Sequence, residues 1–452
     1  AKKWATGVAT STDLIHWEKY PGNPLQPIEE NKSSGIVVHD GKAFRFYTMH
    51  PEVYLHVAAE PKTTDKRGEV VLTDDALKIH REALVFDGHN DLPYKIREKD
   101  DPFFRRYDLT KLQPALHTDI PRLMKGGVGA QFWSAYVAAE TAKDHTAVKQ
   151  TLEQIDTIHR LIKTYPDTFA LALTADDVER IHKEGKIASL IGLEGGHSID
   201  NSLGVLRMLH RLGARYMTLT HSDNLDWADA ATDTPRLKGL SPFGERVVHE
   251  MNRLGMLVDI SHVSADTMRH VLKVAKAPVI ASHSSAFALA DHPRNVPDDV
   301  LKLVARNRGV VMVNFYPGFI TPEGARAMKS MFESYRELQK KYPKKEEFQE
   351  AWGAWKKAHP FPRGSVHDVV DHIEHIIKTA GIDHVGLGSD YDGIGSTPKQ
   401  LDDVSYYPYI TQELLSRGYK RDEIVKVLGG NTLRVIREAE AAARTLRDAR
   451  KE

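Results

Sequence analysis

From residue 76 onward, short apolar runs alternate with longer stretches in which apolar residues recur at helical spacing. Each run has the length of a strand buried on both faces, and each longer stretch has the spacing of an amphipathic helix. The pattern predicts eight strands, at residues 83–86, 129–133, 187–193, 216–219, 256–260, 279–281, 310–313 and 384–388.

This alternation is typical of repeated β-α units around a parallel sheet. No glycine-rich dinucleotide loop follows the first strand, which argues against an open, doubly wound sheet. We therefore predict an α/β fold, a (β/α)8 TIM-like barrel with a small N-terminal β-rich segment. The longest insertion, residues 328–362, is rich in lysine and glutamate and is interpreted as a solvated helical excursion.

The first sixty residues follow a different pattern, of short strands and turns. Residues 35–47 are typical of a hairpin closed by Asp40 and Gly41, and the sequence from residue 51 is polar and rich in turn formers. The predicted organisation is a β-rich segment over residues 1–60, a linker over 61–75 and a barrel over 76–452.

Composition narrows the chemistry. The 62 lysines and arginines balance the 62 aspartates and glutamates, and no long basic run is present, so no nucleic-acid partner is expected. Because there is no cysteine, the 23 histidines and the carboxylates are the only strong ligands for a transition metal. No apolar run is long enough to span a membrane. The compartment stays open between a bacterial periplasm and the cytoplasm, since a leader could precede Ala1.

Polar residues follow several of the predicted strands, where a TIM barrel places its active site. After the first strand, His89 and Asp91 are spaced so that both side chains point the same way. Glu194 follows the third strand, His262 the fifth and His283 the sixth. One histidine at a strand end is more often structural, but five nitrogen and oxygen ligands at four strand ends suit zinc. A shared carboxylate could bridge two ions.

Several longer motifs occur in order between residues 76 and 444. They are residues 87–93 (DGHNDLP), 131–134 (QFWS), 194–199 (EGGHSI), 219–222 (LTHS), 260–264 (ISHVS), 282–285 (SHSS), 294–299 (RNVPDD) and 388–393 (GSDYDG). In this order they resemble the motifs of the membrane (renal) dipeptidases, a branch of the amidohydrolase superfamily. The resemblance implies a zinc-dependent dipeptidase with two Zn²⁺ ions, one held by His89 and Asp91, the other by His262 and His283, with Glu194 bridging them.

The resemblance also implies roles for three further residues. Hydrolysis would use a metal-bridging hydroxide, and His221 would stabilise the developing oxyanion. Arg294 would bind the C-terminal carboxylate of the substrate, and Asp390 would bind the free amino group or carry a proton to the leaving amine. Recognition of both termini limits the substrate to a dipeptide. The structural alternatives are a surface ion pair for Arg294 and a helix cap for Asp390.

Other functions remain open at this point. Related barrels hydrolyse other small amides or lactones, and the fold alone does not decide between substrates. Residues 1–60 resemble one blade of the five-bladed propellers of fructosidases and related glycoside hydrolases. A single blade cannot bury its own face, so no glycosidase activity is predicted. A third reading is a carbohydrate-binding or interaction protein with an inert barrel. The sequence is compatible with a homodimer.

Overall fold

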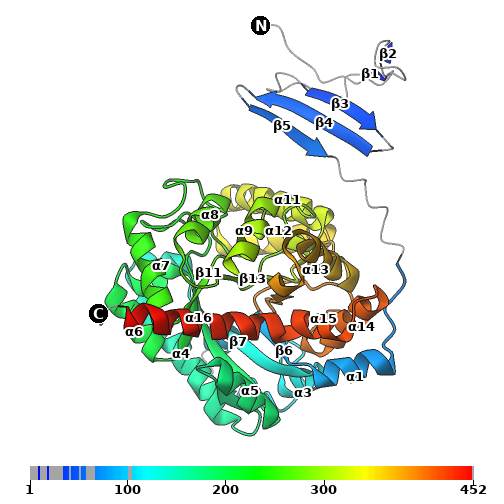
Figure 1. Ribbon diagram of the computed structural model, residues 1–452. Helices are drawn as coiled ribbons and strands as arrows, with labels where there is room; N and C mark the ends of the chain where they lie inside the picture. The colour runs from blue at the N-terminus through cyan, green and yellow to red at the C-terminus, as the bar shows by residue number, and fades with distance from the viewer. Residues whose placement is uncertain are drawn as a thin grey trace. The chain divides into compact units, whose positions relative to one another are not determined.

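The computed structural model describes residues 67–99 and 104–449, together with the backbone of five short N-terminal strands. The chain divides into two compact units, residues 1–68 and 69–452 (Figure 1). None of the described helices is both long and apolar enough to cross a membrane.

The first unit contains two small antiparallel sheets. One pairs β1 (Ala9–Thr10) with β2 (Glu18–Lys19), and the other has the order β3 (Ser34–His39), β4 (Lys42–Met49), β5 (Glu52–Val57). The predicted hairpin is present as β3 and β4, whose register pairs His39 with Lys42. The predicted turn residues, 40 and 41, and the linker residues 61–66 lie outside the described residues. β5 lies where we expected only polar connecting sequence, because residues 52–57 alternate between polar and apolar side chains.

The second unit is built on eight parallel strands that close into a barrel. β14 pairs with β6, and the order around the barrel is β6-β7-β9-β10-β11-β12-β13-β14. These strands are β6 (Val85–Asn90), β7 (Val128–Tyr136), β9 (Ile187–Glu194), β10 (Ala214–Thr218), β11 (Leu257–Asp259), β12 (Ile280–Ala281), β13 (Val310–Val313) and β14 (Val385–Leu387). Each corresponds to a predicted strand, so the predicted TIM-like barrel is confirmed.

Two details differ from the prediction. The first strand continues to Asn90 rather than ending at Phe86, so His89 lies on the strand itself. A short extra strand, β8 (Phe169–Leu171), pairs with the first half of β9, whose second half pairs with β10. Three residues are too few for a periodic pattern to be recognised in the sequence.

Helices connect the strands and cover the outside of the barrel (Figure 1). The last helix, α16, packs against α5 and α7. Outside the predicted insertion, the described α-helices of this unit are α1 (Asp74–Glu82), α2 (Leu92–Glu98), α3 (Ile120–Lys125), α4 (Ala147–Thr164), α5 (Ala175–Lys183), α6 (Leu203–Arg211), α7 (Pro242–Leu254), α8 (Ala265–Val274), α9 (Asp298–Asn307), α10 (Pro317–Ile320), α13 (Val366–Ala380), α14 (Tyr407–Ser416), α15 (Arg421–Val425) and α16 (Asn431–Asp448).

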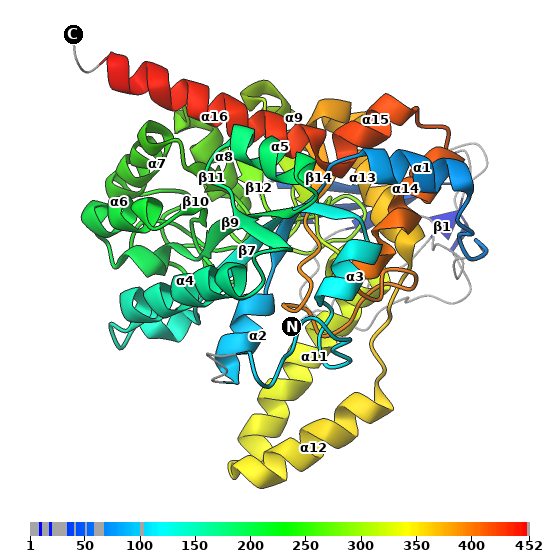
Figure 2. The same ribbon diagram turned by 90° about the horizontal axis from the view of Figure 1, so that it is seen from below.

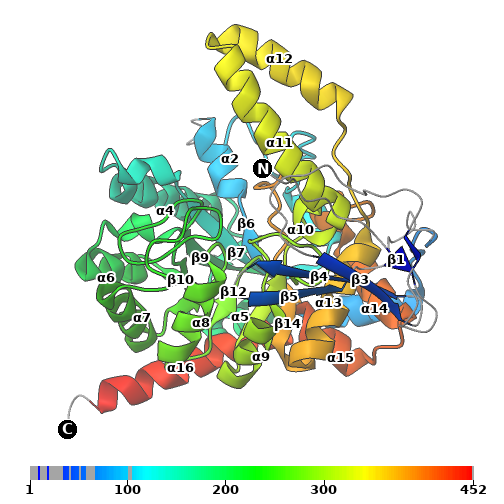
Figure 3. The same ribbon diagram turned by 90° about the horizontal axis from the view of Figure 1, so that it is seen from above.

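The predicted insertion forms a pair of helices, α11 (Pro322–Lys341) and α12 (Lys345–Ala358). Both project away from the barrel (Figures 2 and 3), and α12 has no buried side chain. The pair is joined by edge-to-face contacts of Tyr335 with Phe348 and Trp352, at 5.0 and 5.2 Å between ring centroids. The prediction of a solvated helical excursion is confirmed.

The barrel interior is packed rather than open. Phe86, Phe132 and Tyr216, from three different strands, stack with ring centroids 5.5 and 4.7 Å apart. Gly192 makes room for the Tyr216 ring, since a Cβ at this glycine would collide with it. The tyrosine hydroxyl then reaches His89 Nδ1, at 2.8 Å. The packed aromatic rings therefore hold the Tyr216 hydroxyl within hydrogen-bond distance of His89.

Removal of residues 1–68 is expected to leave the barrel folded, because the unit 69–452 contains all eight barrel strands and the helices that cover them. The thermal unfolding midpoint of the fragment, measured by circular dichroism at 222 nm, should lie within about 3 °C of the main transition of the full chain. A fragment that precipitates, or that unfolds more than about 8 °C lower, would contradict this independence.

Candidate active site

The five residues predicted as metal ligands converge at the C-terminal ends of the barrel strands. His89 lies on β6, and Glu194 is the last residue of β9. His262 and His283 follow β11 and β12, and Asp91 is the N-cap of α2. All five side chains are buried. The barrel thus brings together residues that are up to 194 positions apart in the chain.

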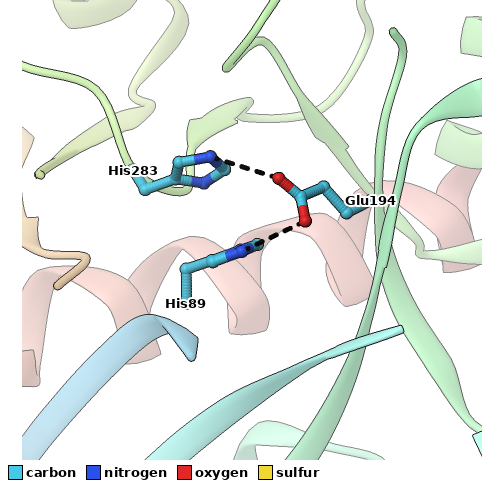
Figure 4. Close-up of side chains that lie close together, drawn as sticks. All are labelled: His89, Glu194 and His283. Carbon is cyan, nitrogen blue, oxygen red and sulfur yellow. Dashed lines mark ion pairs between the residues drawn. The ribbon is translucent and has the colours of Figure 1, made fainter. Parts of the chain in front are cut away.

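Glu194 lies at the centre of this cluster. Its Oε2 is 3.4 Å from His89 Nε2, and its Oε1 is 3.1 Å from His262 Nε2 and 3.5 Å from His283 Nε2. Figure 4 shows His89 and His283 facing different oxygens of the carboxylate. Asp91 adds a second carboxylate, with Oδ2 3.2 Å from His89 Nε2. The two oxygens of Glu194 therefore face different histidines, His89 on one side and His262 with His283 on the other.

His262 and His283 are held as neutral rings. Burial, together with the positive charge of Arg294, lowers the pKa of His262 well below its ordinary value. Burial also lowers the pKa of His283, with contributions from His89 and Arg294. Their Nε2 atoms lie 2.9 Å apart. Neutral imidazole nitrogens that point at a common position are the form in which histidine binds a metal.

The tautomer of His283 follows from a chain of hydrogen bonds. The Ser282 hydroxyl donates its one hydrogen to the buried carboxylate of Asp259, at 2.6 Å. Ser282 Oγ must then accept from His283 Nδ1, which is 2.7 Å away. The proton therefore lies on Nδ1, and Nε2 presents its lone pair to the cluster. Such support of a metal-binding histidine by a hydrogen-bonded group is common in metal sites.

A second buried aspartate, Asp87, ties the first and last strands of the barrel together. Its carboxylate accepts from Ser389 N and Ser389 Oγ, both at 2.7 Å, and from Tyr407 Oη at 2.8 Å. We did not predict a role for Asp87 or Asp259. The signal that could have found them is the same in both places, an aspartate two or three residues before a histidine of the cluster.

The pKa of His89 is shifted in the opposite direction to those of His262 and His283. Burial disfavours its charged form, but the Tyr216 hydroxyl and the carboxylates of Glu194 and Asp91 outweigh burial and raise the pKa of His89 well above its ordinary value. Asp91 Oδ1 is buried and has no hydrogen-bond partner. Two carboxylates that stabilise the protonated form of His89, and a buried carboxylate oxygen that lacks a hydrogen-bond partner, both favour an added cation.

The donor set fits a divalent metal. Among the described residues, three groups have ligand atoms within 4.8 Å of one another: His89, Glu194 and His283; Glu194, His221 and His262; His89, Asp91 and Asp390. Imidazole nitrogen and carboxylate oxygen are the usual zinc ligands when cysteine is absent. His197 lies outside these groups, and its Nε2 is 3.0 Å from the carbonyl oxygen of Val137.

His221 and Arg294 border the cluster. The His221 ring stacks on that of His262, with centroids 4.3 Å apart, and its Nε2 is 3.7 Å from Glu194 Oε1. Burial lowers the pKa of His221 and that of Arg294, the latter to about 10, so the arginine stays charged at neutral pH. Arg294 is buried and its guanidinium lies 5.3 Å above the ring of Phe319. The alternative of a surface ion pair is therefore wrong.

Asp390 lies just after β14, where its backbone N–H donates to the carbonyl oxygen of His89 at 3.1 Å. Its carboxylate accepts from Asn314 Nδ2 at 2.9 Å, and no described helix begins beside it, so the helix-cap alternative is wrong. Burial, aided by Asp91 and Glu194 and opposed by His89, raises the pKa of Asp390 to about 8. Its φ of 65° is left-handed, as is that of His262, at 66°. Such strain costs about 1–3 kcal/mol per residue and is typical of functional sites.

A cavity of about 320 Å³ opens over the cluster, a volume within the range for small-molecule sites. Its walls include Asp91, Glu194, His221, Arg294 and Asp390. We did not predict that aromatic residues, or a second cation besides Arg294, line this cavity, because only the folded chain brings them to it. These residues are Tyr94, Lys95, Tyr136, Tyr316 and Phe319.

A closed parallel barrel that gathers imidazoles and carboxylates at its strand ends defines a metal-dependent hydrolase of the TIM-barrel class. The sequence profile of the membrane dipeptidase family, peptidase family M19, matches residues 73–450. The chain therefore belongs to this family of metallopeptidases, and it is a hydrolase that acts on dipeptides.

Individual relatives agree with the family match. "Dipeptidase aclJ" of Aspergillus oryzae (strain ATCC 42149 / RIB 40) is 42% identical over 371 residues, which cover 80% of this chain and 79% of that protein. Among solved structures, the probable dipeptidase PvdM of Pseudomonas aeruginosa superposes with a TM-score of 0.72 at 24% identity, over 81% of this chain and 98% of that one. A metallopeptidase of Rhodobacter sphaeroides, liganded with a phosphinate mimic of the dipeptide L-Ala-D-Ala, gives 0.64 at 24% identity, over 79% and 99%. These structures support the barrel fold.

Asp259→Ala should destabilise the barrel strongly, because it removes a buried carboxylate that accepts from Ser261 N, Ser282 N and Ser282 Oγ. We expect the free energy of unfolding in urea to fall by about 3 kcal/mol or more. Asp266→Ala is the matched control, since its side chain is 54% exposed and should cost less than about 1 kcal/mol. Equal effects of the two substitutions would show that Asp259 does not organise the strand ends.

Proposed function

We propose that the protein hydrolyses dipeptides with two zinc ions that share Glu194. The observation that carries this proposal is the division of Glu194 between two sets of donors, His89 on one oxygen and His262 with His283 on the other. Asp91 completes the first set. Ser134 Oγ donates to Glu194 Oε2 at 3.1 Å and holds the carboxylate in this orientation. Two divalent cations bound here would lower the pKa of water and polarise the scissile carbonyl.

His221 is suited to stabilise the oxyanion. The Ser222 hydroxyl lies 3.2 Å from its Nδ1, and when it donates there the ring carries its proton on Nε2. That nitrogen faces the cluster and is 3.7 Å from Glu194 Oε1. The reacting carbonyl of the substrate would lie beside this nitrogen. A neutral donor fixed in a buried site stabilises developing negative charge without the cost of reorganising solvent.

Arg294 and Asp390 are suited to bind the two ends of a dipeptide. Arg294 is a buried cation with no ion pair among the described residues, so its charge is available to the substrate's C-terminal carboxylate. Asp390 presents a carboxyl group to the free amino group, or carries the proton that the leaving amine takes up. A cavity closed by both groups accepts two residues and excludes longer peptides. The role of residues 1–60, their boundary with the barrel, and a homodimer stay predictions.

Removal of metal should abolish hydrolysis. We expect dialysis against a chelator to leave a folded, inactive protein, and Zn²⁺ to restore turnover of a dipeptide such as Ala-Ala as binding approaches about two ions per chain. Elemental analysis of the purified protein would measure this ratio. His283→Ala should reduce both the zinc content and the activity, because it removes one nitrogen from the second set of donors. Full activity in the metal-free protein would refute the proposal.

Arg294→Met should remove the preference for a free C-terminal carboxylate. We expect the wild-type protein to hydrolyse Ala-Ala with a kcat/KM about 100-fold above that for its C-terminal amide, a ratio worth about 2.7 kcal/mol, and the variant to treat both alike. Arg306→Met, which changes an exposed arginine, is the control and should keep the ratio. If Arg294→Met keeps it too, the C-terminal carboxylate is bound elsewhere and a neutral amide or lactone becomes the better substrate class.

A further inference from the structure

One cation of the cavity has no assigned role. Lys95 lies on α2, four residues after Asp91, and its backbone N–H donates to the Asp91 carbonyl oxygen at 3.2 Å. Residues four apart on a helix share a face, so the lysine side chain lies one turn beyond the Asp91 carboxylate. It lines the cavity together with Asp91, Glu194 and Asp390. The neighbouring Tyr94 packs edge-to-face on Tyr136, at 5.0 Å, in the same wall.

The charge of Lys95 is not neutralised within the described protein. Over residues 67–99 and 104–449, no ion pair or hydrogen bond involves its half-buried side chain. Three aspartates that line the same cavity have other partners: Asp91 contacts His89, Asp390 accepts from Asn314 Nδ2, and Asp392 accepts from the His117 backbone N–H. A half-buried ammonium without a protein partner attracts an anionic group of a ligand that enters the cavity.

The position of Lys95 indicates which end of the substrate it meets. Asp91 and Asp390 lie close together beside Gly393, because a Cβ at this glycine would collide with a carboxylate oxygen of each. Lys95 therefore flanks the part of the cavity in which Asp390 would receive the amino group. Arg294 is held elsewhere, with its Nη2 3.4 Å from the carbonyl oxygen of His283 and its guanidinium over Phe319.

We propose that Lys95 forms a subsite for an acidic side chain on the N-terminal residue of the substrate, so that dipeptides beginning with glutamate or aspartate are preferred. This proposal rests on the dipeptidase function proposed above. A lysine is suited to this task because its ammonium, on a flexible four-carbon stem, can follow acidic side chains of different length. Arg294 and Asp390 would fix the backbone of the dipeptide, and Lys95 would select its side chain.

The test compares Glu-Ala with the isosteric Gln-Ala on the zinc-loaded full chain. We expect kcat/KM to be about tenfold higher for Glu-Ala, and Lys95→Met, which keeps the apolar stem, to remove the difference while Gln-Ala turnover stays within about twofold of wild type. Lys99→Met is the matched control, because Lys99 lies at the exposed end of the same helix and does not line the cavity. Lys95→Glu should reverse the preference toward Lys-Ala.

Equal kcat/KM for Glu-Ala and Gln-Ala in the wild-type protein, or a preference that survives Lys95→Met, would overturn the subsite. A preference for Ala-Glu over Ala-Gln without one for Glu-Ala would overturn its assignment to the N-terminal residue. These outcomes leave dipeptide hydrolysis itself intact. If the zinc-loaded protein cleaves none of these dipeptides, the dipeptidase proposal fails, and the subsite fails with it.

Discussion

The burial of one carboxylate among several imidazoles is the interaction on which the site depends. Glu194 is removed from water, which alone would raise its pKa, yet His89 and His262 hold that pKa well below its ordinary value. A buried charge of this kind is stable only when the groups around it are fixed in place. The surrounding strand ends are therefore organised around Glu194. Any cation that binds beside Glu194 meets side chains that are already fixed in place.

Two other buried aspartates supply the rigidity. Asp87 joins the end of β14 to β6, which closes the barrel directly below His89. Asp259 collects the donors that follow β11 and β12 and, through Ser282, leaves His283 Nε2 free of a proton. The same network supports the left-handed backbone of His262, whose carbonyl oxygen accepts from Ala231 N at 2.7 Å and from Thr220 Oγ1 at 3.2 Å. The strain is thus compensated by hydrogen bonds from neighbouring loops.

The sequence was sufficient for the barrel because buried parallel strands and amphipathic helices leave strong local patterns, and the same strands carried the histidines to one end. It could not show that Asp87 meets Ser389, since these residues are 302 positions apart and neither has a local pattern that requires the other. The burial of Arg294, and a Lys95 charge that has no partner among the described residues, are likewise properties of the assembled cavity. β8 was not predicted, because its pairing depends on the neighbouring strands. β8 pairs with the start of β9, which is available because β10 pairs with β9 only from Ile191 onward.

The proposed site has two metal positions that share Glu194. This proposal is tested most directly by anomalous scattering at the zinc edge from crystals of the zinc-loaded protein. The account predicts two peaks, one beside His89 and Asp91 and one beside His262 and His283, with Glu194 reaching both. A single peak, or peaks that do not contact Glu194, would contradict it.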